Sequence, residues 1–191
     1  MKRLPETLNE LEIRALLSQP NKRARTGLRD LAMIRLMLNA GLRASEVLSL
    51  TVRDINWRSG KLTIKRGKGD KDRVVWLNED DLEILRSWKE KKPESRLLFT
   101  TLAGQKIKDR YLRAMVKRRA KKAGITKDVH PHTLRHTFAT DLYRDTKNIR
   151  LVQKALGHAA LSNTMIYTHI YDEELESAMK SFRKAKAEVK S

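Results

Sequence analysis

The stretch KLTIKRGKGDKDRVVWL, residues 61–77, decides the fold class, because the helical period of the apolar residues in the flanking segments changes here. Lys61–Ile64 and Arg73–Leu77 are predicted strands, and the glycine-containing segment Gly67–Asp70 predicts a turn that joins them as an antiparallel pair. Asn78, which follows directly, is a typical N-cap for a long helix. A small sheet inside a helical chain is therefore expected.

Two helices are predicted before this stretch. Thr7 is a candidate cap for a short first helix, whose apolar residues at helical spacing are Leu8, Leu11, Leu16 and Leu17. A second helix is predicted from about Thr26 to Ala40 and should end at Gly41, since glycine is the usual residue beyond a helix C-terminus.

The C-terminal half is predicted to be helical throughout. Segment 106–122 carries nine Lys or Arg against one Asp, and its expected buried stripe is Tyr111, Leu112, Met115 and Val116. Three shorter helical segments should follow, the last from Asp172 to about Lys186. We find no internal repeat and no low-complexity linker. We therefore predict one α+β domain over residues 1–191, mainly α-helical, with a small three-stranded antiparallel sheet.

The charge balance indicates a polyanionic partner. The 191 residues include 42 Lys and Arg against 23 Asp and Glu, a formal charge of +19. Nucleic acid is the first candidate, because neutralising its phosphates releases condensed counterions, and an acidic membrane surface is the second. No apolar run approaches the ~20 residues of a spanning helix. Cysteine is absent, which excludes disulfides and thiolate metal sites and is typical of a reducing cytoplasm, where we expect the protein to act.

Four clusters combine reactive side chains with unusual local order: Gly41–Glu46, Gly67–Arg73, His130–His136, and Leu156–His158 with Tyr167–His169. Each has an ordinary structural explanation when taken alone. Arg43 could begin a helix, residues 67–73 could be a basic hairpin tip, Gly157 could be a left-handed helix cap, and Tyr167 could be a core residue.

The cluster His130–His136 is harder to explain structurally. Pro131 at the first helical turn sets the helix phase, so His132, Arg135 and His136 fall at i, i+3 and i+4 on one face. The two histidines also have zinc-site spacing, but Thr133 stands where a metalloprotease has glutamate, and no nearby carboxylate offers a third ligand. We therefore expect an anion rather than a metal between these side chains, and no cofactor.

Together the clusters fit one chemistry, which is attack on a phosphodiester. Arginines bind phosphate through paired hydrogen bonds, a lysine can protonate a leaving oxygen, histidines transfer protons, and a tyrosine can attack phosphorus. No Asp/Glu cluster suited to two metals is present, which argues against a metal-dependent nuclease.

In this order the four clusters resemble the tyrosine recombinase and phage integrase family, and its Xer-type resolvases most of all. The resemblance covers essentially the whole chain, from Leu4-Pro5 to Tyr167. It implies the tyrosine recombinase catalytic-domain fold. It also implies site-specific DNA recombination through a 3′-phosphotyrosyl intermediate on Tyr167, without metal or ATP. Double-stranded DNA would be the partner, and no membrane would be involved.

The resemblance also implies a role for each matched residue. Arg43, Arg135 and His158 would hold the scissile phosphate, and Lys68 would be the general acid for the leaving 5′-oxygen. His132 would accept or position the proton of the tyrosine. Two further matches would support the site, of which Glu46 orients its neighbours and His136 is as well explained by a purely structural role.

The chain departs from the family pattern in two places. The turn Asp145–Asn148 lacks an expected glycine. The chain also begins where the family's N-terminal DNA-binding domain would end, as in a fragment or a minimal recombinase.

Three other functions are alternatives to recombination. A type IB topoisomerase uses a similar residue set. A non-catalytic DNA-binding accessory protein has no need of Tyr167, and a basic RNA-binding protein explains the charge but none of the clusters.

The C-terminal segment 172–191 carries a helical apolar stripe of Leu175, Ala178, Met179 and Phe182. The stripe either packs on its own domain or, as the resemblance implies, is exchanged with a neighbouring protomer. We expect a monomer in free solution that assembles into a homo-tetramer on paired DNA sites.

Overall fold

The computed structural model describes residues 6–65, 72–158 and 164 of the chain. Its helices are α1 (Glu10–Ser18), α2 (Arg25–Asn39), α3 (Ala44–Ser49), α4 (Glu79–Lys91), α5 (Asp109–Lys122), α6 (Pro131–Thr146) and α7 (Ile149–Leu156), with a 3₁₀ turn, η1, at Val52–Asp54. Two strands, β1 (Lys61–Ile64) and β2 (Arg73–Trp76), complete the described part. The predicted mainly helical α+β class is confirmed.

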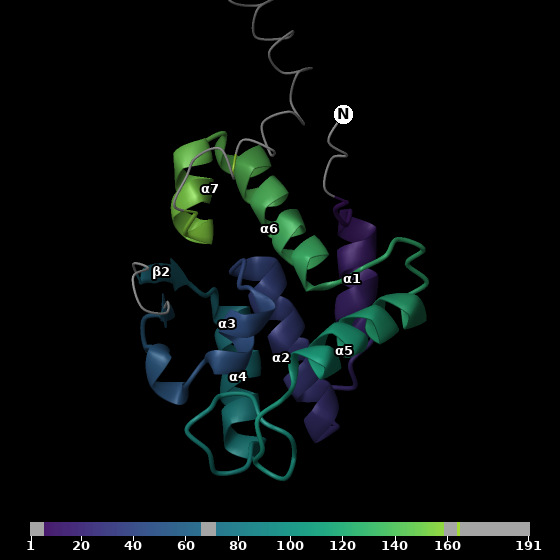
Figure 1. Cartoon of the computed structure of the whole chain (residues 1–191), viewed down its shortest axis with the longest axis vertical. Helices are drawn as coiled ribbons and strands as arrows, with labels where there is room; N and C mark the ends of the chain where they lie inside the picture. The colour runs from purple at the N-terminus through teal and green to yellow at the C-terminus, as the bar shows by residue number, and fades with distance from the viewer. Residues whose placement is uncertain (1–5, 66–71, 159–163, 165–191) are drawn as a thin grey trace, which may run out of the picture.

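The helix α2 forms the centre of the domain. It packs against α4 on one side and α6 on the other, with α1 and α3 also in contact (Figure 1). Nearly all of its residues from Gly27 to Leu38 are buried, the charged Arg29 and Asp30 among them, and Met33, Ile34 and Met37 are fully buried. A helix that is buried on nearly all sides is a core element. These neighbouring helices therefore pack around α2.

The sheet has two strands in the described part of the chain, where three were expected. β1 and β2 pair antiparallel with Lys61 opposite Trp76 and Ile64 opposite Arg73. A third segment contributes only one bridge, between Ile55 and Leu62. Its pairing extends no further, because the residues before Ile55 form η1 and the chain after it turns back at Asn56, whose carbonyl accepts from the Gly60 N–H.

The predicted helix starts are partly right. Asn78 caps α4 as expected, with its side chain accepting from the Asp81 N–H at 2.8 Å. The prediction that Thr7 caps the first helix is wrong, because Asn9 does so in a reciprocal pair with Glu12. Leu11 also lies outside the core, 75% exposed, because it stands about 140° around the helix axis from the buried Leu16.

Helices α6 and α7 form a smaller unit with its own apolar cluster of Ala139, Val152 and Leu156. At 16 residues α6 is the longest described helix, so the expectation of shorter segments is wrong for it. Lys147 ends α6 in the left-handed conformation, with φ of 52°, at the turn where glycine was expected. Predictions for Lys68, Tyr167 and segment 172–191 fall outside the described residues. Among the described helices none has the length and hydropathy needed to cross a bilayer.

Candidate active site

Arg43 stands at the start of α3, where the chain turns sharply out of α2. Gly41 makes that turn with φ of 63°, and a Cβ atom there would lie 2.4 Å from Cδ1 of Phe138. The Arg43 N–H donates to the Glu46 carboxylate at 2.7 Å, and its guanidinium donates to the same carboxylate at 3.0 Å. One short helix therefore fixes both the backbone and the side chain of Arg43 by means of Glu46.

The Glu46 carboxylate is the centre of a buried cluster of charges. Arg73 at the start of β2 donates to both of its oxygens, at 2.6 and 2.8 Å. Arg135 from α6 lies 3.7 Å away. Burial alone would raise the pKa of Glu46, but hydrogen bonds and positive charge, chiefly from Arg73, outweigh burial and lower it to about 2. The carboxylate is therefore ionised at any physiological pH.

Arg135 is buried at the first turns of α6, with its guanidinium held by backbone carbonyls. It donates to the Gly41 carbonyl and, at 2.9 Å, to that of Leu156. Its Nη2 also lies 3.3 Å from Nε2 of His158. Arg135 thus joins the turn before α3, the end of α7 and the histidine that follows it.

His158 follows the left-handed cap Gly157, which has φ of 63° and ends α7 as predicted. On the other side of the ring, Nδ1 of His158 lies 3.1 Å from Oγ1 of Thr164. Both ring nitrogens of His158 therefore have a polar neighbour, Arg135 on one side and Thr164 on the other.

His132 and His136 lie on α6 beside Arg135. The His132 ring is exposed and lies edge-on to His130, with 6.1 Å between centroids. Partial burial lowers the pKa of His132, and nearby positive charges, among them those of His130 and Arg113, lower it further. His136 is half-buried, and burial followed by the charges of its neighbours lowers its pKa to about 4. Both imidazoles are therefore neutral near pH 7.

The structure brings together four of the eight predicted site residues, Arg43, Glu46, Arg135 and His158, and sets His132 and His136 beside them. Lys68 and Tyr167 lie outside the described residues. Sequence reasoning missed Arg73 as a member of the cluster. The sequence carries little signal for it, because Val74, Val75 and Trp76 are all apolar and hide which side of the strand faces inward. The structure places Arg73 on the same buried side of β2 as Val75.

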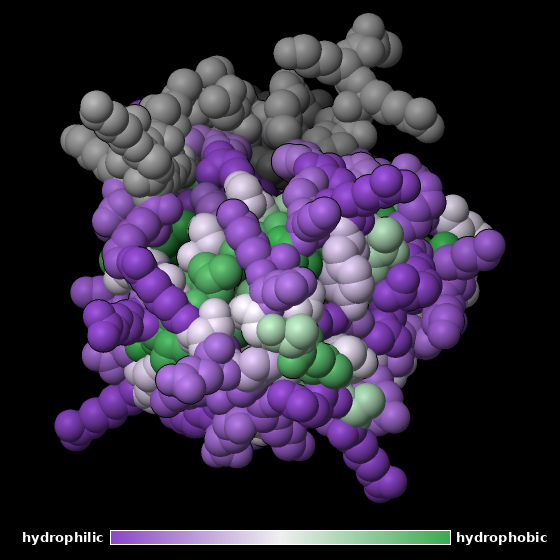
Figure 2. All heavy atoms as spheres, turned by 60° about the horizontal axis from the view of Figure 1, so that its bottom comes forward, coloured by the Kyte–Doolittle hydropathy of each residue, from purple (hydrophilic) through white to green (hydrophobic). Residues whose placement is uncertain are grey.

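Much of the described surface is hydrophilic. Figure 2, which brings the lower end of Figure 1 forward, shows long hydrophilic side chains covering most of that face, with small apolar patches between them. On α5 the exposed residues Arg110, Arg113 and Lys117 share one face at i, i+3 and i+7. Because the charge of Arg113 reaches His132, this face begins next to the arginine–histidine cluster.

Comparison with known proteins identifies the chain's relatives. The model of the phage integrase family matches residues 6–174. Tyrosine recombinase XerD of Staphylococcus saprophyticus is 35% identical over 188 residues, and XerD of Staphylococcus aureus matches to the same extent. The match covers 95% of this chain and 63% of either relative, so the chain spans less than two thirds of their length.

Solved structures with the same fold include recombinases and an integrase. XerA recombinase superposes with a TM-score of 0.81 at 32% identity, covering 96% of this chain and 67% of that one. XerH site-specific recombinase, bound to its palindromic difH substrate in a post-cleavage complex, gives 0.80 at 35% identity, covering 95% and 54%. The catalytic domain of bacteriophage HP1 integrase gives 0.64 at 28% identity and covers 92% and 94%.

Proposed function

The chain belongs to the phage integrase family, and from this premise and the geometry of its arginine cluster we propose that it cuts and rejoins double-stranded DNA at specific sites. The nucleophile is Tyr167, which forms a 3′-phosphotyrosyl bond and releases a 5′-hydroxyl. Two similar proteins support the proposal, since XerD is a tyrosine recombinase and XerH was solved on a DNA substrate.

The observation that carries the proposal is the convergence of Arg43, Arg135 and His158 from three separate elements. Three guanidinium groups, those of Arg43, Arg73 and Arg135, surround one ionised carboxylate, so the cluster holds two positive charges in excess. A phosphodiester carries one negative charge and its pentacovalent transition state carries two. Fixed positive charge aimed at that difference lowers the barrier by electrostatic preorganisation.

The roles of the individual side chains follow from their exposure and bonding. Arg43, with its side chain 36% exposed, is the arginine best placed to grip a phosphate oxygen. The plane of Arg135 is fixed by the Gly41 and Leu156 carbonyls, and His158 orients it from the other side. His132, exposed and neutral, accepts the phenolic proton of Tyr167, and Lys68 protonates the leaving 5′-oxygen.

The covalent intermediate makes the reaction reversible without ATP or a metal, because the phosphotyrosyl bond keeps the energy of the cleaved linkage. A free 5′-hydroxyl from another strand can attack it and complete strand exchange. A type IB topoisomerase would use the same bond to relax a single duplex. The recombinase is favoured because the similar proteins described above are recombinases and an integrase.

The DNA contact surface should extend from this cluster along α5. Arg110, Arg113 and Lys117 point out on one face of that helix, and each phosphate they neutralise adds to the salt dependence of binding. Affinity for a single site should therefore fall steeply as salt rises.

The test begins with a half-site selected from random duplex DNA. A nicked version of that site should give a covalent protein–DNA band with the natural chain, in EDTA as well as without it. Tyr167→Phe should bind the same DNA and give no band. A band from Tyr167→Phe, or loss of the band in EDTA with recovery on adding one divalent ion, would overturn the proposal.

We infer further that the protein is a monomer in free solution and assembles into a tetramer on paired sites through segment 172–191. An apolar pocket of about 430 Å³ between β2, α6 and α7 supports this, since it exposes Trp76 and Leu151 with no described segment over them. Deleting the residues after Asp172 should spare single-site binding and abolish synapsis. Normal recombination by the truncated chain would contradict the inference, and so would its failure to fold.

A further inference from the structure

Arg73 connects three elements that carry the candidate active site. It begins β2, it donates to both Glu46 oxygens on α3, and its Nε donates to the Ala155 carbonyl of α7 at 2.9 Å. Ala155 lies three residues before His158, and the neighbouring Leu156 carbonyl accepts from Arg135. One side chain therefore spans the sheet, the helix that orients Arg43 and the end of the helix that precedes His158.

The bonding of Arg73 separates it from a residue that binds DNA. Its side chain is 5% exposed, about as little as the 6% of Arg135, so burial alone does not distinguish the two. Every guanidinium nitrogen of Arg73 donates to the protein itself, and two of the three donate to the Glu46 carboxylate. With its paired donors on that carboxylate, Arg73 acts on the reaction through the residues that it holds.

We propose that Arg73 is a positioning residue, which balances the charge of Glu46 and so keeps Arg43 and Arg135 in place to act on the scissile phosphate. This inference rests on the proposed function, because it assumes that both arginines act on phosphate. Without Arg73, the cationic partners of the carboxylate among the described residues would be Arg43 and Arg135, and each would be drawn more strongly toward Glu46. A guanidinium moved by about 1 Å can cost roughly 10²-fold in rate.

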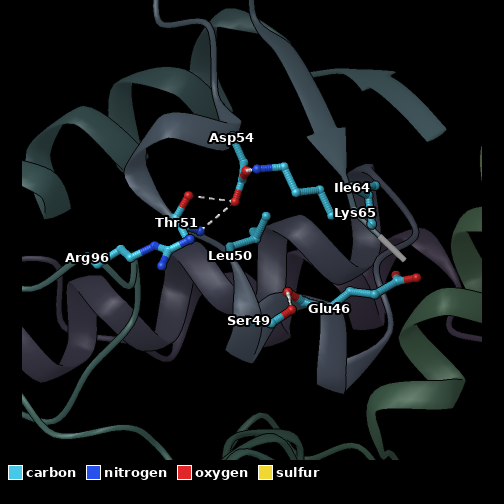
Figure 3. Close-up of a pocket in the computed structure, with 8 residues that line it drawn as sticks. All are labelled: Glu46, Ser49, Leu50, Thr51, Asp54, Ile64, Lys65 and Arg96. Carbon is cyan, nitrogen blue, oxygen red and sulfur yellow. Dashed lines mark hydrogen bonds and ion pairs between the residues drawn. The ribbon is translucent and has the colours of Figure 1, made fainter. Parts of the chain in front are cut away.

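Among the described residues, the other cations that line the neighbouring pocket do not reach the Glu46 carboxylate. Figure 3 shows that the stem of Glu46 lines a pocket of about 330 Å³, while its carboxylate points away from the charged residues on the far side. There Lys65 is paired with Asp54 at 3.0 Å, and Asp54 also accepts two hydrogen bonds from Thr51. Arg96 lines the same pocket and reaches toward Thr51 rather than Glu46 (Figure 3).

The charge of Glu46 itself depends on Arg73. Burial raises the pKa of this carboxyl, and Arg73 provides the largest opposing contribution, ahead of Arg43 and Arg135. Without Arg73 the pKa of Glu46 must rise. As the pH falls, the Glu46 carboxylate of the variant would then become protonated and lose its attraction for Arg43, in a pH range where Glu46 of the natural chain stays ionised.

The experiment compares Arg73→Met with Arg119→Met in the full chain. Arg119 is a matched control, because it also pairs at 2.8 Å with a buried carboxylate, Asp30, which has a second arginine partner in Arg29. Asp30 therefore forms its ion pairs with Arg29 and Arg119, away from the Glu46 cluster. For each variant the measurements are single-site DNA affinity, the first-order rate of covalent complex formation on the nicked site, and that rate between pH about 5 and about 8.

Arg73→Met should slow covalent complex formation by roughly 10²-fold while DNA affinity changes little, and its deficit should widen as the pH falls. Arg119→Met should lose stability without a pH-dependent deficit. Adding Glu46→Gln to Arg73→Met should cost far less than the two single effects combined, because both act on one cluster.

Arg73→Lys keeps the proposal testable if Arg73→Met does not fold. Lysine keeps the charge but not the paired geometry, so the rate should fall by roughly tenfold, as for a lost charge-assisted hydrogen bond. A natural-chain rate from Arg73→Lys, or a deficit in Arg73→Met that is confined to DNA affinity, would overturn the role of Arg73. Absence of any covalent complex with the natural chain would instead refute the proposed function.

Discussion

Replacing Glu46 by glutamine should destabilise the fold by an amount that depends on pH. The pKa of this carboxyl falls from 4.5 to about 2 on folding, which corresponds to about 3 kcal/mol of stability at neutral pH. A lowered folded-state pKa contributes stability that is complete above the unfolded value of 4.5 and is lost as the pH falls toward 2. Glutamine cannot titrate, so the difference between the natural chain and the variant should shrink across that window.

The assay is urea unfolding at several pH values, followed by the fluorescence of tryptophans such as the buried Trp88. Glu46→Gln should lower the free energy of unfolding by about 3 kcal/mol near pH 7 and by much less near pH 3. Glu10→Gln is the control, because Glu10 pairs with Arg14 on the surface, where such pairs contribute about 0–1 kcal/mol. A loss in Glu46→Gln that is below about 1 kcal/mol, or that does not change with pH, would refute the electrostatic account of this cluster.

Three further outcomes are expected. Gly41→Ala should lower the free energy of unfolding in urea by about 2–4 kcal/mol, because Gly41 has a left-handed φ and its new Cβ would contact Phe138. Gly124→Ala is the control and should lower it by only about 1 kcal/mol, since Gly124 has φ of 73° but open space around it. Equal losses would contradict the contact with Phe138. Arg43→Ala should slow covalent complex formation more than Arg43→Lys, since lysine keeps the charge without the paired donors, and equal rates would mean that charge alone matters. Lys68→Ala should slow cleavage by roughly 10²–10⁴-fold. The variant's cleavage rate should recover on a substrate with a bridging 5′-sulfur, whose leaving group needs no proton. If the sulfur substrate is cleaved as slowly, Lys68 binds the phosphate rather than donating a proton.

The parts of the fold that depend on local sequence could be predicted. Asn78 caps its helix through its own side chain, and Gly157 ends α7 because a left-handed residue is needed there. The start of α1 could not be predicted correctly, because the backbone at Thr7 and Leu8 makes hydrogen bonds with distant parts of the chain. The Thr7 carbonyl accepts from Lys127 and the Leu8 N–H donates to Thr137, contacts that span more than a hundred residues.

The same distinction holds for the candidate site. Arg43, Arg135 and His158 could be named because they stand in ordered motifs. The cluster that organises them could not be derived, since Glu46 and Arg73 are 27 residues apart and their pairing depends on how α3 packs against the sheet. The apolar run Val74–Trp76 hides which side of β2 faces inward, and a basic residue beside a polar turn is more often a solvated one.

The most direct test of the account is to map the covalent bond itself. The natural chain would be trapped on a nicked site labelled at the scissile phosphate, digested with protease, and the labelled peptide sequenced by mass spectrometry. The account predicts a single labelled peptide in which Tyr167 carries the 3′-phosphate of the cut strand, with a free 5′-hydroxyl on the other side. A label on any other residue, a bond to the 5′-phosphate, or cleavage without a covalent bond would contradict it.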